Sequence, residues 1–182
     1  MKFIIAILFS VISLPSLGVE HIDEQPKNNF TFGFALSNVE ALGYELPDNP
    51  IGFNFKYRYD FNEQYGIISS FTYSGLDEYY NTSIGNTRLR LDYYSYSIGP
   101  TLRANKYFSV YGLVGVASGE ITGNYAISGN TLSETERKTE FVYGGGLQVD
   151  VNENLTLDAS IEYTNFDEIE AKTFTIGAGY RF

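Results

Sequence analysis

The sequence predicts an all-β protein, an eight-stranded antiparallel up-and-down barrel that crosses a membrane with its strands. Three observations support this prediction. Apolar and polar residues alternate in segments that recur along the chain, and alternation is typical of strands with one apolar and one polar face. Each segment has about ten residues, a length that crosses a bilayer at a tilt. Short turns alternate with longer polar connections, as in barrels of bacterial outer membranes.

The first four segments place aromatic or aliphatic residues at most of the alternate positions, with Ser69 as an exception. Within Ile51–Phe61, for example, Phe53, Phe55 and Tyr57 share one face while Lys56 and Arg58 share the other. This period of two predicts strands over Asn28–Leu36, Ile51–Phe61, Gly66–Ser74 and Asp92–Arg103.

The last four segments follow the same rule with more glycine. Phe108–Gly119 is mixed because its glycines blur the alternation. Phe141–Asp150, Leu155–Thr164 and Thr173–Phe182 again set aliphatic and aromatic residues against Gly, Gln and charged residues. We therefore predict four further strands over these ranges.

The connections are of two kinds. Asp60–Tyr65, Arg103–Tyr107 and Asp150–Leu155 are short, and in each an Asn, which favours turns, precedes a charged residue. The other four are mostly longer and polar, and we expect them to form outer loops at residues 37–50, 75–91, 120–140 and 165–172.

The N-terminus predicts export. Residues 1–18 combine Lys2 with an apolar run and end in small residues, as a signal peptide does, and the barrel domain would then span 19–182. The alternative is a membrane anchor or a buried first helix. The chain has no Cys, its one His is His21, and its formal charge of −10 argues against nucleic acid as a partner.

The faces of the strands indicate which side meets lipid. One face is apolar and aromatic, while the other carries Gly, Ser, Thr and charges, which fit a narrow eight-stranded interior better than Tyr and Phe do. A soluble exported β-sandwich is the alternative. In the barrel, the residues expected to face lipid or its aromatic girdles are Phe30, Phe55, Tyr57, Phe71, Tyr73, Tyr94, Tyr96 and Tyr180.

With these strands placed, the sequence resembles the Ail/Lom/OmpX family of small outer-membrane proteins. The matching stretches are Gly52–Asp60, Gly66–Ser74, Tyr93–Val116, Tyr143–Tyr163 and Ile176–Phe182. The resemblance implies adhesion or complement evasion through the outer loops, and it implies that Tyr180 and Phe182 belong to a signal for the outer-membrane assembly machinery. It fades in the four long connections, so it supports the fold more directly than the function.

The charged residues of inward parity predict a polar network that plugs the lumen. They are Lys56, Arg58, Arg103, Asp158, Glu162 and Arg181, and we expect the two carboxylates to pair with the arginines. An ion path is the alternative, although a filled eight-stranded barrel leaves no wide pore. The chain offers no recognisable catalytic, metal or cofactor site, so an enzyme is not predicted.

The long connections predict the partners. They carry twelve carboxylates against five basic residues, which puts polyanion binding in doubt. Arg88, Arg90 and Arg137 have outward parity and could contact lipopolysaccharide phosphates. The predicted function is adhesion or host interaction by a monomer in the outer membrane, with host surface or serum proteins as partners. The alternatives are a structural barrel for envelope integrity and a minor channel for small solutes or ions.

Overall fold

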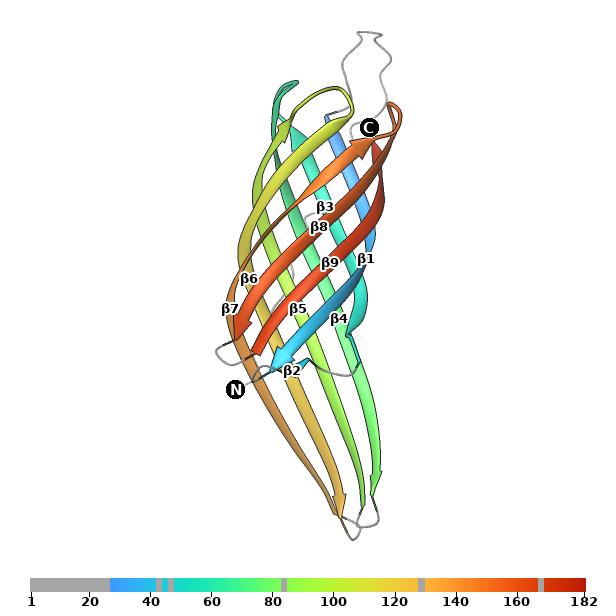
Figure 1. The fold of residues 1–182 in the computed structure, drawn as a ribbon, viewed down its shortest axis with the longest axis vertical. Coiled ribbons are helices and arrows are strands. Elements are labelled where there is room, and N and C mark those ends of the chain that lie inside the picture. The colour runs from blue at the N-terminus through green and yellow to red at the C-terminus, as the bar shows by residue number, and fades with distance from the viewer. Residues whose placement is uncertain (1–26, 42–43, 46–47, 83–84, 128–129, 167–168) are drawn as a thin grey trace, which may run out of the picture.

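The structure is a computed structural model that describes residues 27–41, 44–45, 48–82, 85–127, 130–166 and 169–182. Within these ranges the chain forms strands joined by turns (Figure 1). The strands are β1 (Asn28–Ala41), β2 (Tyr44–Glu45), β3 (Ile51–Asp60), β4 (Tyr65–Thr82), β5 (Gly85–Arg103), β6 (Phe108–Ile127), β7 (Asn130–Asp150), β8 (Leu155–Phe166) and β9 (Ile169–Arg181).

The strands form one antiparallel sheet that closes on itself. Each long strand pairs with its neighbour in the chain, and β1 also pairs with β9 from Asn29↔Arg181 to Ala41↔Ile169. The two-residue β2 pairs only with the end of β1, so the closed wall has eight strands, as the sequence predicts. The described residues include no helix of the length and apolarity needed to cross a membrane.

The three short turns share one hydrogen-bonding scheme. The Asn62 side chain accepts hydrogen bonds from the backbone N–H groups of Gln64 and Tyr65, each at 2.9 Å. Asn105 and Asn152 accept the equivalent pairs of bonds in the other two turns. Such Asx turns hold the chain reversal locally, which explains the repeated Asn in the sequence. We call this end of the barrel, at the top of Figure 1, the short-turn end.

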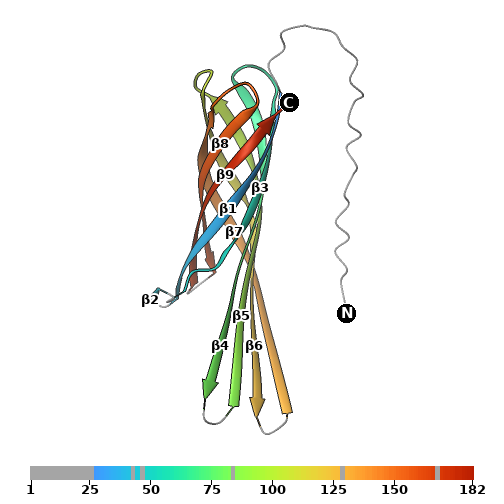
Figure 2. The ribbon, with the colours of Figure 1, turned by 90° about the vertical axis from the view of Figure 1, so that its right-hand side faces the viewer.

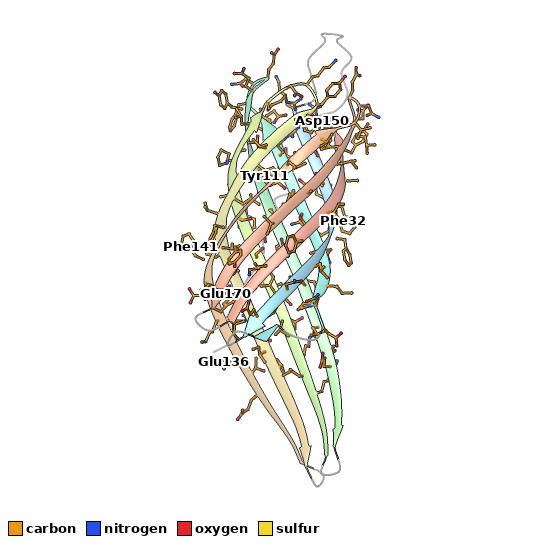
Figure 3. The ribbon with its side chains drawn as sticks, in the orientation of Figure 1. Phe32, Tyr111, Glu136, Phe141, Asp150 and Glu170 are labelled. Atoms are coloured by element: carbon orange, nitrogen blue, oxygen red, sulfur yellow. The ribbon has the colours of Figure 1, made fainter. Side chains whose placement is uncertain are left out.

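The burial pattern is the inverse of that in a soluble protein. Buried residues are mostly polar or charged, and large apolar side chains cover the outside. Figure 3 shows Phe32 and Phe141 pointing away from the wall. Of the residues expected to face lipid, Phe55 and Tyr73 are partly covered by neighbouring rings, whereas the other six are exposed. An apolar surface of this kind is stable against hydrocarbon and not against water. The structure therefore confirms the predicted lipid-facing barrel and not the alternative, a soluble β-sandwich.

The structure differs from the sequence prediction in the two longest loops. The described residues of 75–91 and 120–140 continue as strands, with β4 paired to β5 as far as Thr82↔Gly85 and β6 to β7 as far as Ile127↔Asn130. Four strands therefore project beyond the barrel as an open sheet (Figure 2). The polar residues of these segments predicted loops. Outside the membrane, however, a strand can also carry polar groups, because these groups can pair across the sheet.

The other two predicted loops also contain strand. β1 continues into 37–50 as far as Ala41, where it pairs with β2 and β9. Residues 165–172 contain the end of β8 and the start of β9, with Phe166 opposite Ile169. Among the strands that the structure describes, β4–β7 are the ones that reach far beyond the barrel wall (Figure 2).

Phe55 tests the orientation of the wall. It lies halfway along β3 on the outer face, in ring contact with Phe32 at a centroid distance of 5.1 Å. We expect Phe55→Arg to lower the free energy of unfolding by about 2–4 kcal/mol, because it places a charge in hydrocarbon. Denaturant titration in phospholipid vesicles measures the loss, and Phe55→Leu, which keeps an apolar side chain, should lose clearly less. Equal losses for both variants would assign the effect to ring packing instead.

Candidate functional site

A ring of charges lies inside the short-turn end of the barrel. It is formed by residues at the ends of four alternate strands: Asp60 on β3, Arg103 on β5, Asp150 on β7 and Arg181 on β9. Arg103 contacts both carboxylates, at 2.9 Å from Asp60 and 3.3 Å from Asp150, and Arg181 lies 3.0 Å from Asp150. The sign of the charge alternates around the ring, so each guanidinium faces carboxylate oxygens.

Arg58 joins this ring from one position deeper in the lumen. Its side chain is 1% exposed, its Nε lies 3.2 Å from Asp60 Oδ1, and its Nη1 donates a 2.6 Å hydrogen bond to Gln148. A buried guanidinium without counter-charge would be strongly unfavourable. The ring therefore makes this buried cation tolerable.

A second ionic pair occupies the middle of the lumen. Lys56 Nζ lies 2.6 Å from Asp158 Oδ1 and donates a 3.0 Å hydrogen bond to Thr175. The other oxygen of Asp158 accepts a 2.8 Å hydrogen bond from the hydroxyl of Tyr111. Both charged side chains are about 1% exposed, so they are neutralised by each other rather than by water.

Glu162 is held without a cation among the described residues. Its carboxylate accepts hydrogen bonds from Ser95 at 2.7 Å, Thr72 at 3.2 Å and Ser70 at 3.3 Å, and it is 1% exposed. Several hydroxyl donors can solvate a buried carboxylate in place of water. The hydroxyl-rich faces of β4 and β5 thus have a defined role in the lumen.

The structure places all six predicted lumen residues inside the barrel but pairs them differently from the sequence prediction. We expected Asp158 and Glu162 to pair with arginines, whereas the arginines contact Asp60 and Asp150. Asp60 and Asp150 border turns and were therefore not among the predicted lumen residues, although they share the inward parity of Arg58 and Gln148. The up-and-down topology brings the ends of alternate strands to one rim, which alternation alone does not reveal.

An apolar layer closes the opposite end of the lumen. Tyr93, Ala117, Val142, Phe166 and Ala171 form a buried cluster, in which the rings of Tyr93 and Phe166 meet edge-on with centroids 6.4 Å apart. On the side of this layer that faces the projecting strands lies a cavity of about 150 Å³, at the barrel mouth. The lumen is therefore a charged interior capped by an apolar layer.

The projecting sheet carries ion pairs on its outward-parity face. Arg88 donates to both oxygens of Asp77, Arg90 donates to Asp92 at 2.7 Å, and Arg137 lies 2.5 Å from Glu120. The hydrogen bond from Arg88 lowers the pKa of Asp77 below its usual value, so this exposed pair keeps its charges further into the acid range than an isolated Asp would. Each of the three arginines predicted to contact lipopolysaccharide thus already has a carboxylate partner.

The C-terminal strand completes the wall at the short-turn end. The backbone of Phe182 exchanges two hydrogen bonds with Asn28, at 3.1 and 2.9 Å. The rings of Tyr180 and Phe182 stack on the outer surface with centroids 6.3 Å apart. The aromatic terminus is thus exposed on the lipid-facing side, and its role in assembly stays a prediction.

The described residues contain no group of three or more His, Cys, Asp or Glu side chains that could hold a metal ion. His21 lies outside the described residues. The buried carboxylates are occupied with lysine, arginine or hydroxyl partners. These lumen side chains fill the interior of the barrel with charges that are neutralised by ion pairs or hydrogen bonds.

Comparison with known proteins identifies close relatives. A family described as outer membrane protein beta-barrel domain matches residues 4–182. The attachment invasion locus protein of Yersinia pseudotuberculosis is 39% identical over 178 residues, covering 95% of this chain and 94% of that protein. Outer membrane protein X of Escherichia coli K12 is 38% identical over 154 residues, or 84% of each chain. Virulence membrane protein PagC of Salmonella typhimurium is 30% identical over 186 residues, covering 97% and 98%.

Solved structures of Ail superpose on this chain. Ail, the attachment invasion locus protein of Yersinia pestis, in complex with the heparin analogue sucrose octasulfate, superposes with a TM-score of 0.79 at 37% identity, covering 87% of this chain and all of that one. The backbone structure of the same protein in a phospholipid bilayer nanodisc has a TM-score of 0.58 at 37% identity, covering 86% and 99%. The likeness extends over the barrel and most of both chains.

The Lys56–Asp158 pair tests the energetics of the lumen. We expect Lys56→Met to lower the free energy of unfolding by about 3–5 kcal/mol, because it leaves the Asp158 carboxylate buried without a counter-charge. Removing the second charge as well, in Lys56→Met/Asp158→Asn, should recover part of this loss. Unfolding titrations of the wild type, both single variants and the double variant give the coupling energy. Strictly additive losses would show that the two charges do not stabilise each other.

Proposed function

Because this chain belongs to the outer membrane protein beta-barrel family, with Ail and OmpX among its relatives, and lies in the bacterial outer membrane, we propose that it is an adhesion and host-interaction protein. Its partners would be host surface or serum proteins. The activity lies in binding by the projecting strands β4–β7 and involves no catalysis. Attachment, invasion and virulence appear in the names of the relatives, which supports this proposal.

The projecting four-stranded sheet is the observation that carries the proposal. At about 3.4 Å per residue, the paired stretch from Leu76↔Leu91 to Thr82↔Gly85 is about 20 Å long. β4 has no neighbour beyond Gly75 on its β3 side, and β7 has none before Val142 on its β8 side, within the described pairings. Open sheet edges with unpaired backbone groups accept extended segments of other chains.

The lumen argues against conduction as the main activity. Four cations and four carboxylates fill it, namely Lys56, Arg58, Arg103, Arg181, Asp60, Asp150, Asp158 and Glu162. Their mutual contacts and the apolar cap fill the described part of the lumen, and an eight-stranded barrel filled with side chains has no room for a wide pore. We propose that this network serves to stabilise the fold.

The charge of the projecting sheet points to a partner other than a polyanion. Ail of Yersinia pestis was solved with a heparin analogue. In this chain, the described residues of 76–91 and 120–140 carry more carboxylates than basic groups, and three of the arginines pair with carboxylates. We propose that contacts of Arg88, Arg90 and Arg137 with lipopolysaccharide phosphates are at most secondary, because they would have to displace these partners.

Shortening one hairpin separates adhesion from a purely structural role. Residues 122–135 can be replaced by Asn-Gly, a two-residue hairpin turn, so that Ile121 and Glu136 remain paired and the Glu120–Arg137 bridge is kept. We expect binding to cultured epithelial cells and survival in serum to fall, while barrel stability stays the same. A gel run with and without boiling verifies that the variant is folded.

Unchanged binding and survival in this folded variant would contradict adhesion through the hairpin and favour the structural barrel. Conductance in planar bilayers, measured on the same preparations, tests the channel alternative. We expect no conductance beyond that of the lipid.

A further inference from the structure

The two faces of the projecting sheet differ in how well their side chains are satisfied. On the outward face, Asp77–Arg88, Arg90–Asp92 and Glu120–Arg137 form ion pairs, and the hydroxyls of Thr122 and Thr135 lie 3.3 Å apart. Polar groups that already have partners gain little from a ligand. This face is therefore a solvated surface.

The inner face, which continues the lumen wall, is apolar in its centre. The pairings align one row of cross-strand neighbours as Leu76, Leu91, Ile121 and Glu136, and the next row as Glu78, Leu89, Gly123 and Glu134. The three leucines and Ile121 are only partly buried. An apolar strip of this kind, outside the membrane and open on one side, is a typical place for a partner to bind.

A cavity continues this strip into the barrel mouth. Its apolar wall includes Val39, Tyr93, Ile121, Phe166 and Ile169, and its volume is about 150 Å³. An apolar cavity of about this size holds one benzene-sized group. The site can therefore take a single phenylalanine or leucine side chain.

Carboxylates border this apolar strip on the inner face. Glu78 lies on the β4 side, and Glu134, Glu136 and Glu140 lie on the β7 side together with Lys138. Glu134 and Glu136 are exposed, and within the described ranges neither side chain contacts a cation. Figure 3 shows Glu136 near the point at which the sheet leaves the barrel. The charge of the border is negative.

We propose that the inner face and mouth cavity bind a segment of a host protein in which one phenylalanine or leucine is flanked by lysines or arginines. This inference rests on the proposed adhesion function and names the chemistry of its partner. The apolar side chain enters the cavity, and the flanking cations face Glu134 and Glu136. A second copy of the same face would oppose carboxylate to carboxylate, and a lipopolysaccharide acyl chain would bring phosphates to this acidic border.

The test uses the mature protein in phosphatidylcholine nanodiscs and the labelled peptide Lys-Lys-Phe-Lys-Lys, with binding measured by fluorescence anisotropy. Peptides with Ser in place of Phe, or Glu in place of Lys, test the two parts of the recognition. We expect each replacement to weaken binding by about tenfold or more, because each removes either the buried apolar group or the charge attraction.

Two protein variants locate the site. The atoms nearest to a Cβ on Gly119 would be those of the Phe166 ring, at 3.5 Å or more, so Gly119→Leu fills the cavity without a backbone clash. Its control is Gly112→Leu on the outer face of the same strand, where a Cβ has open space. Glu134→Lys/Glu136→Lys reverses the border charge, and Thr135→Lys, on the opposite face between them, is its control.

We expect Gly119→Leu and Glu134→Lys/Glu136→Lys to bind the peptide about tenfold more weakly, and both controls to bind as the wild type does. Equal binding by all variants, or equal binding of the Ser peptide, would overturn the proposal. Because peptide binding is measured without cells, the outcome is separate from that of adhesion. If the shortened hairpin abolishes cell binding while these two variants adhere normally and no peptide binds, adhesion stands and the peptide site does not.

Discussion

The constraint on which this structure depends is that no polar backbone group and no charge can face hydrocarbon without a partner. Antiparallel pairing around the whole wall satisfies the backbone, and the β1–β9 ladder removes the two edges that an open sheet would expose. The same constraint favours an inward position for charged side chains of the wall, as at Lys56, Arg58, Asp158 and Glu162. It therefore sets both the aromatic outer surface and the polar lumen.

The charged side chains that point into the lumen must be neutralised there. The neutralisation occurs in layers, with the alternating ring of Asp60, Arg103, Asp150 and Arg181 at the short-turn end and the Lys56–Asp158 pair below it. Hydroxyl donors solvate Glu162, and an apolar cluster closes the other end. Equal numbers of cations and carboxylates leave this interior without a net formal charge, and the ion pairs and hydroxyl donors offset the desolvation of each buried group.

Beyond the barrel mouth the chain is surrounded by water, so polar groups no longer need a partner within the protein. Strands β4–β7 continue into water, where ladder edges and carboxylates are tolerated because solvent can pair with them (Figure 2). The alternation that separates lipid from lumen in the barrel persists here and separates an ion-paired face from an apolar, acid-bordered one. One strand pattern thus builds both the membrane anchor and the surface available to partners.

Alternation by itself determined the eight-stranded barrel, its lipid-facing aromatics and the inward position of charges such as Lys56 and Asp158, because parity along a strand is a local property. Asn62 and its two counterparts likewise indicated the turns. Only the tertiary structure decided that Asp60 and Asp150 hold the arginines, and that the polar hairpins are strands with an apolar inner face. Both depend on which strands pair and in what register, and alternation within one strand does not specify either.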